Sequence, residues 1–104
     1  MEKIGIIGSG TWGTAIAVLL VNNGHEVTLW SAIPAEIEEM AKTRTHRNLP
    51  GVTLPEGLIY TADLEKAMAD KDLLVMAVPS VFVRSTAQKM KPFCKDGQLI
   101  VDVA

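Results

Sequence analysis

The sequence has little cysteine and lacks a long uncharged hydrophobic run. Cys94 is the only cysteine of the 104 residues, so an intrachain disulfide is excluded and a reducing, cytoplasmic setting is expected. No apolar run approaches the ~18–20 residues of a transmembrane helix, and Gly8 interrupts the N-terminal stretch before it has the length of a signal-peptide core. No activating base lies near Cys94, which we interpret as a small, partly buried side chain rather than a nucleophile.

A large excess of charge of one sign is also lacking. Ten Lys and Arg residues against 12 Asp and Glu give a net charge of −2, without the basic footprint of a nucleic-acid-binding domain. A hydrophobic content of 48% excludes intrinsic disorder. Compact domains cluster at about 100–150 residues. We therefore expect residues 1–104 to form one domain with its own core.

What the sequence does contain is an alternation of short apolar runs and helical patterns. Continuous apolar runs are typical of strands that are buried on both faces of a parallel sheet. Such runs occur at residues 4–7, 27–30, 73–78 and 99–101 with Val103, and a weaker one occurs at 58–60. These five segments are the predicted strands.

Helical periodicity fills most of the intervals between these runs. The predicted apolar faces consist of Ala15, Ile16, Leu19 and Leu20; of Ile33, Ile37, Met40 and Ala41; of Leu64, Ala67 and Met68; and of Val83, Ala87 and Met90. Pro34 suits the first turn of its helix, and Asp63 and Ser80 are expected to cap the next two. Residues 44–57 are interpreted as a loop. The order of the elements predicts an α/β fold with a doubly wound parallel sheet.

A G-x-G-x-x-G motif runs from Gly8 to Gly13, directly after the first predicted strand and at the start of a predicted helix. In such a motif Gly8 permits a sharp turn, Gly10 lets the backbone approach a pyrophosphate, and Gly13 allows the helix to pack closely on the sheet. The helix N-terminus offers free N–H groups and a positive dipole end to the phosphates. In this strand–turn–helix context the motif predicts a Rossmann-type site for NAD or NADP.

The usual partner of this motif is an acidic residue about 20 residues further on, which binds the ribose 2′-hydroxyl at the end of the second strand. This sequence has Ser31 and Ala32 there, with neither a carboxylate nor an arginine. Arg44 and Arg47 lie in a loop that could fold back toward this place. The choice between NAD and NADP therefore stays open.

Other polar residues receive simpler interpretations. The acidic run at residues 36–39 reads as a solvated helix face. His25 and His46 are far apart in the sequence and, with a single cysteine, make no metal-ligand set, so no metal site is predicted. Asp102 lies near the carboxyl end of the last predicted strand, where it could contact a ligand or remain solvated.

Several segments resemble those of a known family, both in their amino-acid sequence and in their order along the chain. They are residues 8–15 (GSGTWGTA), 24–30 (GHEVTLW), 48–51 (NLPG), 54–55 (LP), Thr61 with 63–64 (DL), and 77–82 (AVPSVF). With a tryptophan inside the glycine motif and the V-P-S-x-x-F segment, the whole chain resembles the N-terminal cofactor-binding domain of NAD(P)-dependent glycerol-3-phosphate dehydrogenases.

The resemblance implies an oxidoreductase that interconverts sn-glycerol 3-phosphate and dihydroxyacetone phosphate by hydride transfer with NAD(H) or NADP(H), which feeds phospholipid synthesis. Together with the glycine motif, it gives a set of expected cofactor-binding residues: Gly8, Ser9, Gly10, Thr11, Trp12, Gly13, Ser31, Ala32 and Phe82. Relatives often carry a basic or larger side chain at position 32, so Ala32 is a departure.

The resemblance also implies a second part of the protein. Family members continue from the last strand into a Lys-Gly segment and a C-terminal helical domain that supplies the catalytic lysine. That domain is absent from these residues, so we expect no catalytic residue and no activity in this chain alone, and an uncovered apolar surface that favours a homo-oligomer. The alternatives are the cofactor domain of another small-substrate dehydrogenase and a non-catalytic nucleotide-sensing module.

Overall fold

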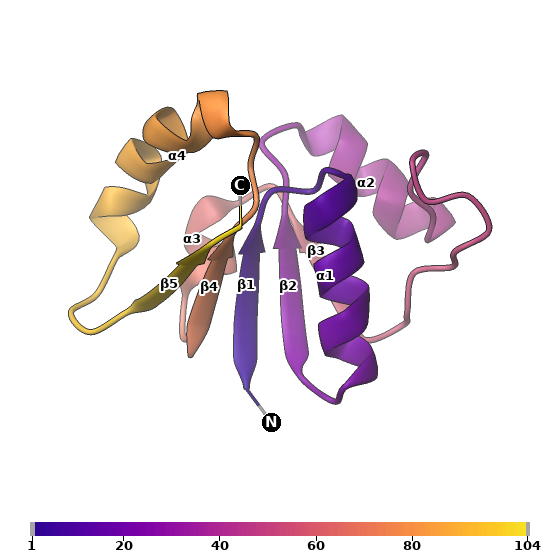
Figure 1. Cartoon of the computed structure of the whole chain (residues 1–104), viewed down its shortest axis with the longest axis horizontal. Coiled ribbons are helices and arrows are strands. Elements are labelled where there is room, and N and C mark those ends of the chain that lie inside the picture. Colours follow the sequence, from indigo (N-terminus) through magenta and orange to yellow (C-terminus); the bar gives the residue numbers. More distant parts are fainter. Residues whose placement is uncertain (1, 104) are drawn as a thin grey trace.

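The computed structural model describes residues 2–103 and contains a sheet of five parallel strands (Figure 1). The strands are β1 (Lys3–Ile7), β2 (Glu26–Trp30), β3 (Leu58–Thr61), β4 (Leu73–Met76) and β5 (Leu99–Asp102). Their order across the sheet is β3-β2-β1-β4-β5, so the chain moves outward from β1 to β3 and then returns to the other side of β1. This reversal between β1 and β4 confirms the predicted doubly wound α/β fold.

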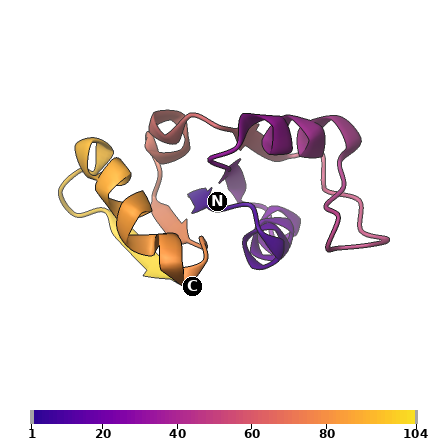
Figure 2. The ribbon, with the colours of Figure 1, turned by 90° about the horizontal axis from the view of Figure 1, so that it is seen from above.

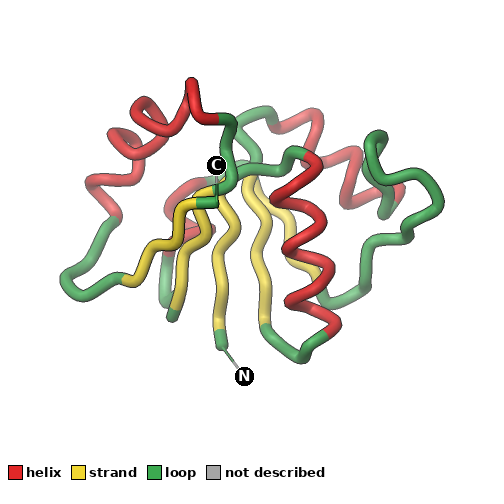
Figure 3. Tube along the Cα trace, in the orientation of Figure 1, coloured by secondary structure: helices red, strands yellow, loops and turns green. Residues whose placement is uncertain are grey.

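Four α-helices cover the two faces of this sheet. They are α1 (Thr11–Asn22), α2 (Pro34–Thr43), α3 (Leu64–Met68) and α4 (Val83–Met90), with 3₁₀ turns η1 (Ser80–Phe82) and η2 (Lys91–Phe93) at either end of α4. The buried apolar side chains of α1 and α2 join one hydrophobic cluster and those of α3 and α4 join another, so each pair covers one face of the sheet. Figure 2 shows the helices arranged around the strands, seen from above. The connections from β1 to β3 and those from β3 to β5 run in opposite directions across the sheet. Because each crossover is right-handed, their helices lie on opposite faces. The loops that follow β1, β2 and β4 consequently meet at one edge of the sheet (Figure 3).

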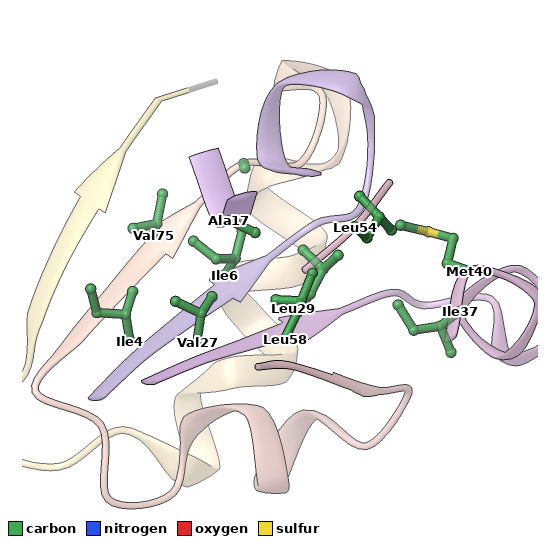
Figure 4. Close-up of a cluster of buried hydrophobic side chains, with 11 residues drawn as sticks. Ile4, Ile6, Ala17, Val27, Leu29, Ile37, Met40, Leu54, Leu58 and Val75 are labelled. Atoms are coloured by element: carbon green, nitrogen blue, oxygen red, sulfur yellow. The ribbon is translucent and has the colours of Figure 1, made fainter. Parts of the chain in front are cut away.

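Two hydrophobic clusters fill the spaces between the sheet and its helices. Alternate residues of a strand point to opposite faces, so Ile4 and Ile6 join the cluster under α1 and α2, while Ile7 joins the cluster under α3 and α4. Figure 4 shows the first cluster, whose labelled members are Ile4, Ile6, Ala17, Val27, Leu29, Ile37, Met40, Leu54, Leu58 and Val75. Burial on both faces explains why the strands appear in the sequence as continuous apolar runs.

The buried face of α1 differs from the prediction. Gly13, Thr14 and Ala17 are buried, whereas Leu19 is 59% exposed. The helix lies close to the sheet through its smallest side chains, and its larger apolar side chains are displaced to the flanks. Of the predicted face, Ile16 and Leu20 are partly buried against the cluster, whereas Leu19 is not, so apolar periodicity placed this face only in part.

The connection from β4 to α4 also differs from the prediction. The strand ends at Met76, two residues earlier than expected, because Pro79 has no N–H group and the chain leaves the sheet on its approach to this residue. Ser80 begins the turn η1 and does not cap α4, which begins at Val83. In α4 the buried residues are Thr86 and Met90, so the prediction is confirmed for Met90 and wrong for Ala87, which is exposed.

Other local predictions have mixed outcomes. Pro34 occupies the first turn of α2, and the Asp63 carboxylate accepts hydrogen bonds from the N–H groups of Glu65 (3.0 Å) and Lys66 (3.4 Å), so both predicted helix starts are confirmed. Cys94, however, is exposed, and its interpretation as a partly buried side chain is wrong. It directly follows the short turn η2, none of whose residues is buried.

Strand β5 is covered much less than its neighbours. All four of its residues are exposed, and Leu99 is 65% exposed. Leu99 and Val101 pair in register with Leu73 and Val75, so they share the face of the sheet that α1 and α2 cover elsewhere. We call the side chains of Leu99 and Val101 the β5 face. It is an apolar surface at one edge of the sheet.

Candidate functional site

A pocket of about 460 Å³ lies at the edge of the sheet where three loops meet. The loops follow β1, β2 and β4, and the first turns of α2 and the length of α4 complete the wall. The lining residues are Gly8, Ser9, Gly10, Trp30, Ser31, Ala32, Ile33, Glu36, Val78, Pro79, Phe82, Ser85, Thr86 and Lys89. In open α/β sheets ligands bind at this topological switch point, outside the carboxyl ends of the strands.

The three glycines of the motif stand in different surroundings. Gly8 has a φ of +125°, and a Cβ there would approach the backbone of Ala77 and Val78 to 2.8 Å. A Cβ on Gly13 would collide with the carbonyl oxygen of Gly8, so this residue lets α1 approach the turn. Beside Gly10, by contrast, no other part of the described chain comes within 4 Å of a Cβ position. The first and third glycines serve the fold, while the second faces open space in the pocket.

The N-terminus of α1 faces the same space without a side-chain cap. Gly10 is the N-cap residue, and no side chain of residues 2–103 accepts from the first N–H groups of the helix there. The first turn contains no acidic residue either. Free N–H groups and the positive end of the helix dipole are therefore available to an anion, and the open space beside Gly10 gives it room. These residues fit a dinucleotide pyrophosphate.

Ser9 is fixed by three hydrogen bonds. Its carbonyl oxygen accepts from Thr14 Oγ1 (3.1 Å) and His46 Nε2 (2.9 Å), and its hydroxyl donates to Glu36 Oε1 (3.1 Å). His46 Nδ1 accepts the N–H of Asn48 (3.1 Å), so the ring proton stands on Nε2 and is donated to Ser9. Because the Ser9 carbonyl and the Gly10 N–H belong to one planar peptide, anchoring the carbonyl also fixes the direction of that N–H.

His46 is therefore a structural residue of the site that the sequence did not identify. It is buried, although it belongs to the long loop between α2 and β3. Arg44, in the same loop, donates through Nε to the Leu54 carbonyl (3.1 Å) and pairs with Glu56 (3.7 Å). Arg47 lines a second pocket of about 450 Å³ beside α2, and neither arginine lines the pocket at the glycine turn. The residues next to His46 in the sequence gave no indication that its side chain would be buried against Ser9.

The end of β2 lacks an acidic residue, as the sequence indicated. Ser31 is buried, its N–H donates to the Thr61 carbonyl (3.2 Å), and its Oγ accepts the N–H of Ile33 (3.1 Å). Ala32 is exposed on the pocket wall. A carboxylate nevertheless reaches this place from the first turn of α2, because Glu36 is partly buried and contacts Ser9. The predicted solvated helix face is confirmed for Glu38 and Glu39, which are exposed, and wrong for Glu36.

The remaining predicted site residues divide into two groups. Phe82 lines the pocket from η1 with a side chain that is 55% exposed. Thr11 and Trp12 lie in the first turn of α1, both exposed, and do not line the pocket wall. Asp102 ends β5 and does not line it either. Within residues 2–103, no group of three or more His, Cys, Asp or Glu side chains is placed to hold a metal, and no helix could span a membrane.

A doubly wound sheet with a glycine turn, an uncapped helix N-terminus and a pocket at the switch point is typical of a dinucleotide-binding domain. Comparison with known proteins gives the family. A family model described as the N-terminus of NAD-dependent glycerol-3-phosphate dehydrogenase matches residues 3–104, and the chain belongs to this family. The predicted family and its NAD(P) cofactor class are thereby confirmed.

Individual relatives agree with this result. The chain is 53% identical to glycerol-3-phosphate dehydrogenase [NAD(P)+] 2 of Lactobacillus delbrueckii subsp. bulgaricus and 52% identical to glycerol-3-phosphate dehydrogenase [NAD(P)+] of Agathobacter rectalis. Both matches cover 100% of this chain but only 31% of the relative. A crystal structure of glycerol-3-phosphate dehydrogenase from Coxiella burnetii superposes with a TM-score of 0.91 at 30% identity, covering 97% of this chain and 31% of that one. The described fold therefore corresponds to about a third of these proteins.

Proposed function

We propose that this domain binds NAD(H) or NADP(H) in the pocket at the glycine turn. The pyrophosphate would lie beside Gly10, against the free N–H groups of α1, and the adenosine would lie between the loop after β2 and the start of α4. The observation that carries the proposal is the open space beside Gly10 at an uncapped helix N-terminus. The proposed cofactor-binding residues are Gly8, Ser9, Gly10, Thr11, Trp12, Gly13, Ser31, Ala32 and Phe82.

Calorimetric titration of the purified chain with NADH tests this proposal. We expect saturable binding with one site per chain. Adenosine monophosphate, which lacks the pyrophosphate and the second nucleotide, serves as the matched weaker ligand. Absence of NADH binding at millimolar concentration would overturn the proposal for this domain.

For the whole protein of which such a domain is a part, we propose interconversion of sn-glycerol 3-phosphate and dihydroxyacetone phosphate by hydride transfer to or from the nicotinamide. The bound cofactor would supply the hydride, and the residues described here would hold and orient it. Support comes from family membership and from relatives about three times as long. A role in supplying glycerol phosphate for phospholipids follows from this reaction.

We propose further that residues 1–104 form one cofactor-binding domain that acts in the cytoplasm, does not bind nucleic acid, and self-associates through the β5 face when nothing else covers it. The exposed Leu99 and Val101 support the last point, since unpaired apolar strand edges promote association. Sedimentation of the chain and of a Leu99→Lys variant would test it, and a monomeric unmodified chain would contradict it.

A further inference from the structure

The carboxylate of Glu36 occupies a distinctive place in the pocket. Glu36 lies in the first turn of α2, directly beyond the end of β2, and lines the pocket together with Ser31 and Ala32. Its Oε1 accepts the hydroxyl proton of Ser9, a residue of the glycine turn, at 3.1 Å. The carboxylate thus bridges the two segments between which the ribose next to the pyrophosphate must lie.

We propose that Glu36 binds the adenosine ribose hydroxyls and makes this domain selective for NAD over NADP. The proposal rests on the proposed dinucleotide function and concerns the same pocket. In dinucleotide-binding domains an acidic residue at the tip of the second strand accepts hydrogen bonds from the ribose. Here the tip has Ser31 and Ala32, and Glu36 supplies the missing carboxylate from one helical turn further along the chain.

The charges around the pocket favour a ribose hydroxyl over a 2′-phosphate in this corner. A 2′-phosphate carries up to two negative charges and would stand beside the Glu36 carboxylate. Arg44 is paired with Glu56, and Arg47 lines the other pocket. Neither arginine of the loop after α2 therefore lines this pocket, where it could neutralise a 2′-phosphate. Lys89 is the one cation among the lining residues, and it belongs to the last turn of α4, whereas Glu36 contacts the glycine turn.

A first-turn carboxylate also stabilises its helix through the dipole, whether or not a cofactor binds. The two roles differ in their consequences, since a helix-stabilising residue would affect NADH and NADPH equally. Glu36→Gln removes the charge but keeps an oxygen that accepts the Ser9 hydroxyl. Glu39→Gln is the matched control, because Glu39 lies on the same helix but does not line this pocket.

The experiment measures the dissociation constants of NADH and NADPH by calorimetry for the unchanged chain and both variants. We expect the unchanged chain to bind NADH at least about tenfold more tightly than NADPH, Glu36→Gln to reduce this ratio by about tenfold, and Glu39→Gln to leave it unchanged. If Glu36→Gln fails to fold, Glu36→Asp replaces it. Asp keeps the charge on a shorter side chain, so NADH affinity should fall while discrimination against NADPH persists.

Three results would overturn this assignment. The first is equal affinity of the unchanged chain for NADH and NADPH. The second is a variant, Glu36→Gln or Glu36→Asp, that changes neither the ratio of the two dissociation constants nor the affinity for NADH. A preference for NADPH that disappears in Lys89→Gln would assign the pocket to a 2′-phosphate. Failure of both cofactors to bind the unchanged chain would instead overturn the proposed function, and this assignment with it.

Discussion

Gly8 and Gly10 are two residues apart in one turn, yet a side chain would have opposite effects at the two positions. Gly10→Val should abolish NADH binding while the fold persists, because its side chain would enter only the space proposed for the pyrophosphate. Gly8→Val should lower the stability by several kcal/mol, since its φ and its backbone neighbours leave no room for a Cβ. Circular dichroism melting and calorimetric titration of both variants check this. Unchanged affinity in Gly10→Val would mean that the phosphates bind elsewhere.

His46 gives a second prediction at this scale. His46→Leu should cost about 1–3 kcal/mol of stability, because it leaves the Asn48 N–H and one bond of the Ser9 carbonyl unsatisfied. It should also weaken NADH binding, since the Ser9–Gly10 peptide loses an anchor. His46→Gln can still donate to Ser9 and should recover part of the affinity. Chemical denaturation and calorimetry measure the two effects, and equal affinities in both variants would rule out a positioning role.

The sequence predicted individual residues unevenly, for physical reasons. Gly8, Gly10 and Gly13 were recognisable because a turn, a close approach and a tight helix contact each require glycine. Glu36 and His46 were not, because their importance comes from contacts with Ser9 across 27 and 37 residues of chain. A charged residue in a helix and a histidine in a loop carry no local sign of such contacts.

At the scale of elements, strands were easier to predict than helix faces. Burial on both sides makes β1, β2 and β4 continuously apolar, and this signal is independent of register. For α1 the sequence offers many apolar residues around the helix, so the distance of the helix from the sheet decides which are buried. That distance is set by Gly13, which has no side chain, and by Ala17, whose methyl group is small, and neither is distinguished by apolar periodicity.

Strand β3 contains a polar group that its environment does not satisfy. The hydroxyl of Tyr60 is buried and has no hydrogen-bond partner among the described residues. Burial raises the pKa of this phenol above its ordinary value, and the nearby Arg44 guanidinium lowers it in part. Tyr60→Phe should therefore be neutral or stabilising by up to about 1 kcal/mol near pH 7.

The same tyrosine gives a pH dependence with a definite sign. Its raised pKa means that the unfolded chain releases the phenolic proton first, near pH 10, while the folded chain retains it. The stability contribution of Tyr60 is present below that pH and is lost as the pH rises through the folded-state pKa. Denaturation curves between pH 8 and about 11 should show a smaller alkaline loss in Tyr60→Phe than in the unchanged chain. Parallel losses would contradict this.

At the scale of the whole molecule, the chain alone should not oxidise NADH with dihydroxyacetone phosphate. Positioning of a substrate can contribute about 7–11 kcal/mol to a rate enhancement, and it requires a site that holds the substrate phosphate and carbonyl. The pocket described here contains one cation, Lys89, and the pocket beside α2 contains one arginine, Arg47, so neither is lined by several Lys or Arg side chains. An absorbance assay, with a full-length relative as positive control, measures this. Turnover that co-purifies with the chain would show that the active site lies within these residues.

The two tryptophans occupy contrasting places, and this has a spectroscopic consequence. Trp30 is 5% exposed, donates through Nε1 to the Ala62 carbonyl (3.2 Å) and lines the pocket, whereas Trp12 is 62% exposed. Trp30 should therefore emit at shorter wavelength and resist quenching by iodide, while Trp12 should be quenched readily. Reduced nicotinamide absorbs light where tryptophan emits, so a dinucleotide bound in the pocket would accept excitation energy from the indole beside it. Trp30 is therefore an energy donor that would report cofactor binding, and comparing the unchanged chain with Trp12→Phe and Trp30→Phe variants would separate the two contributions.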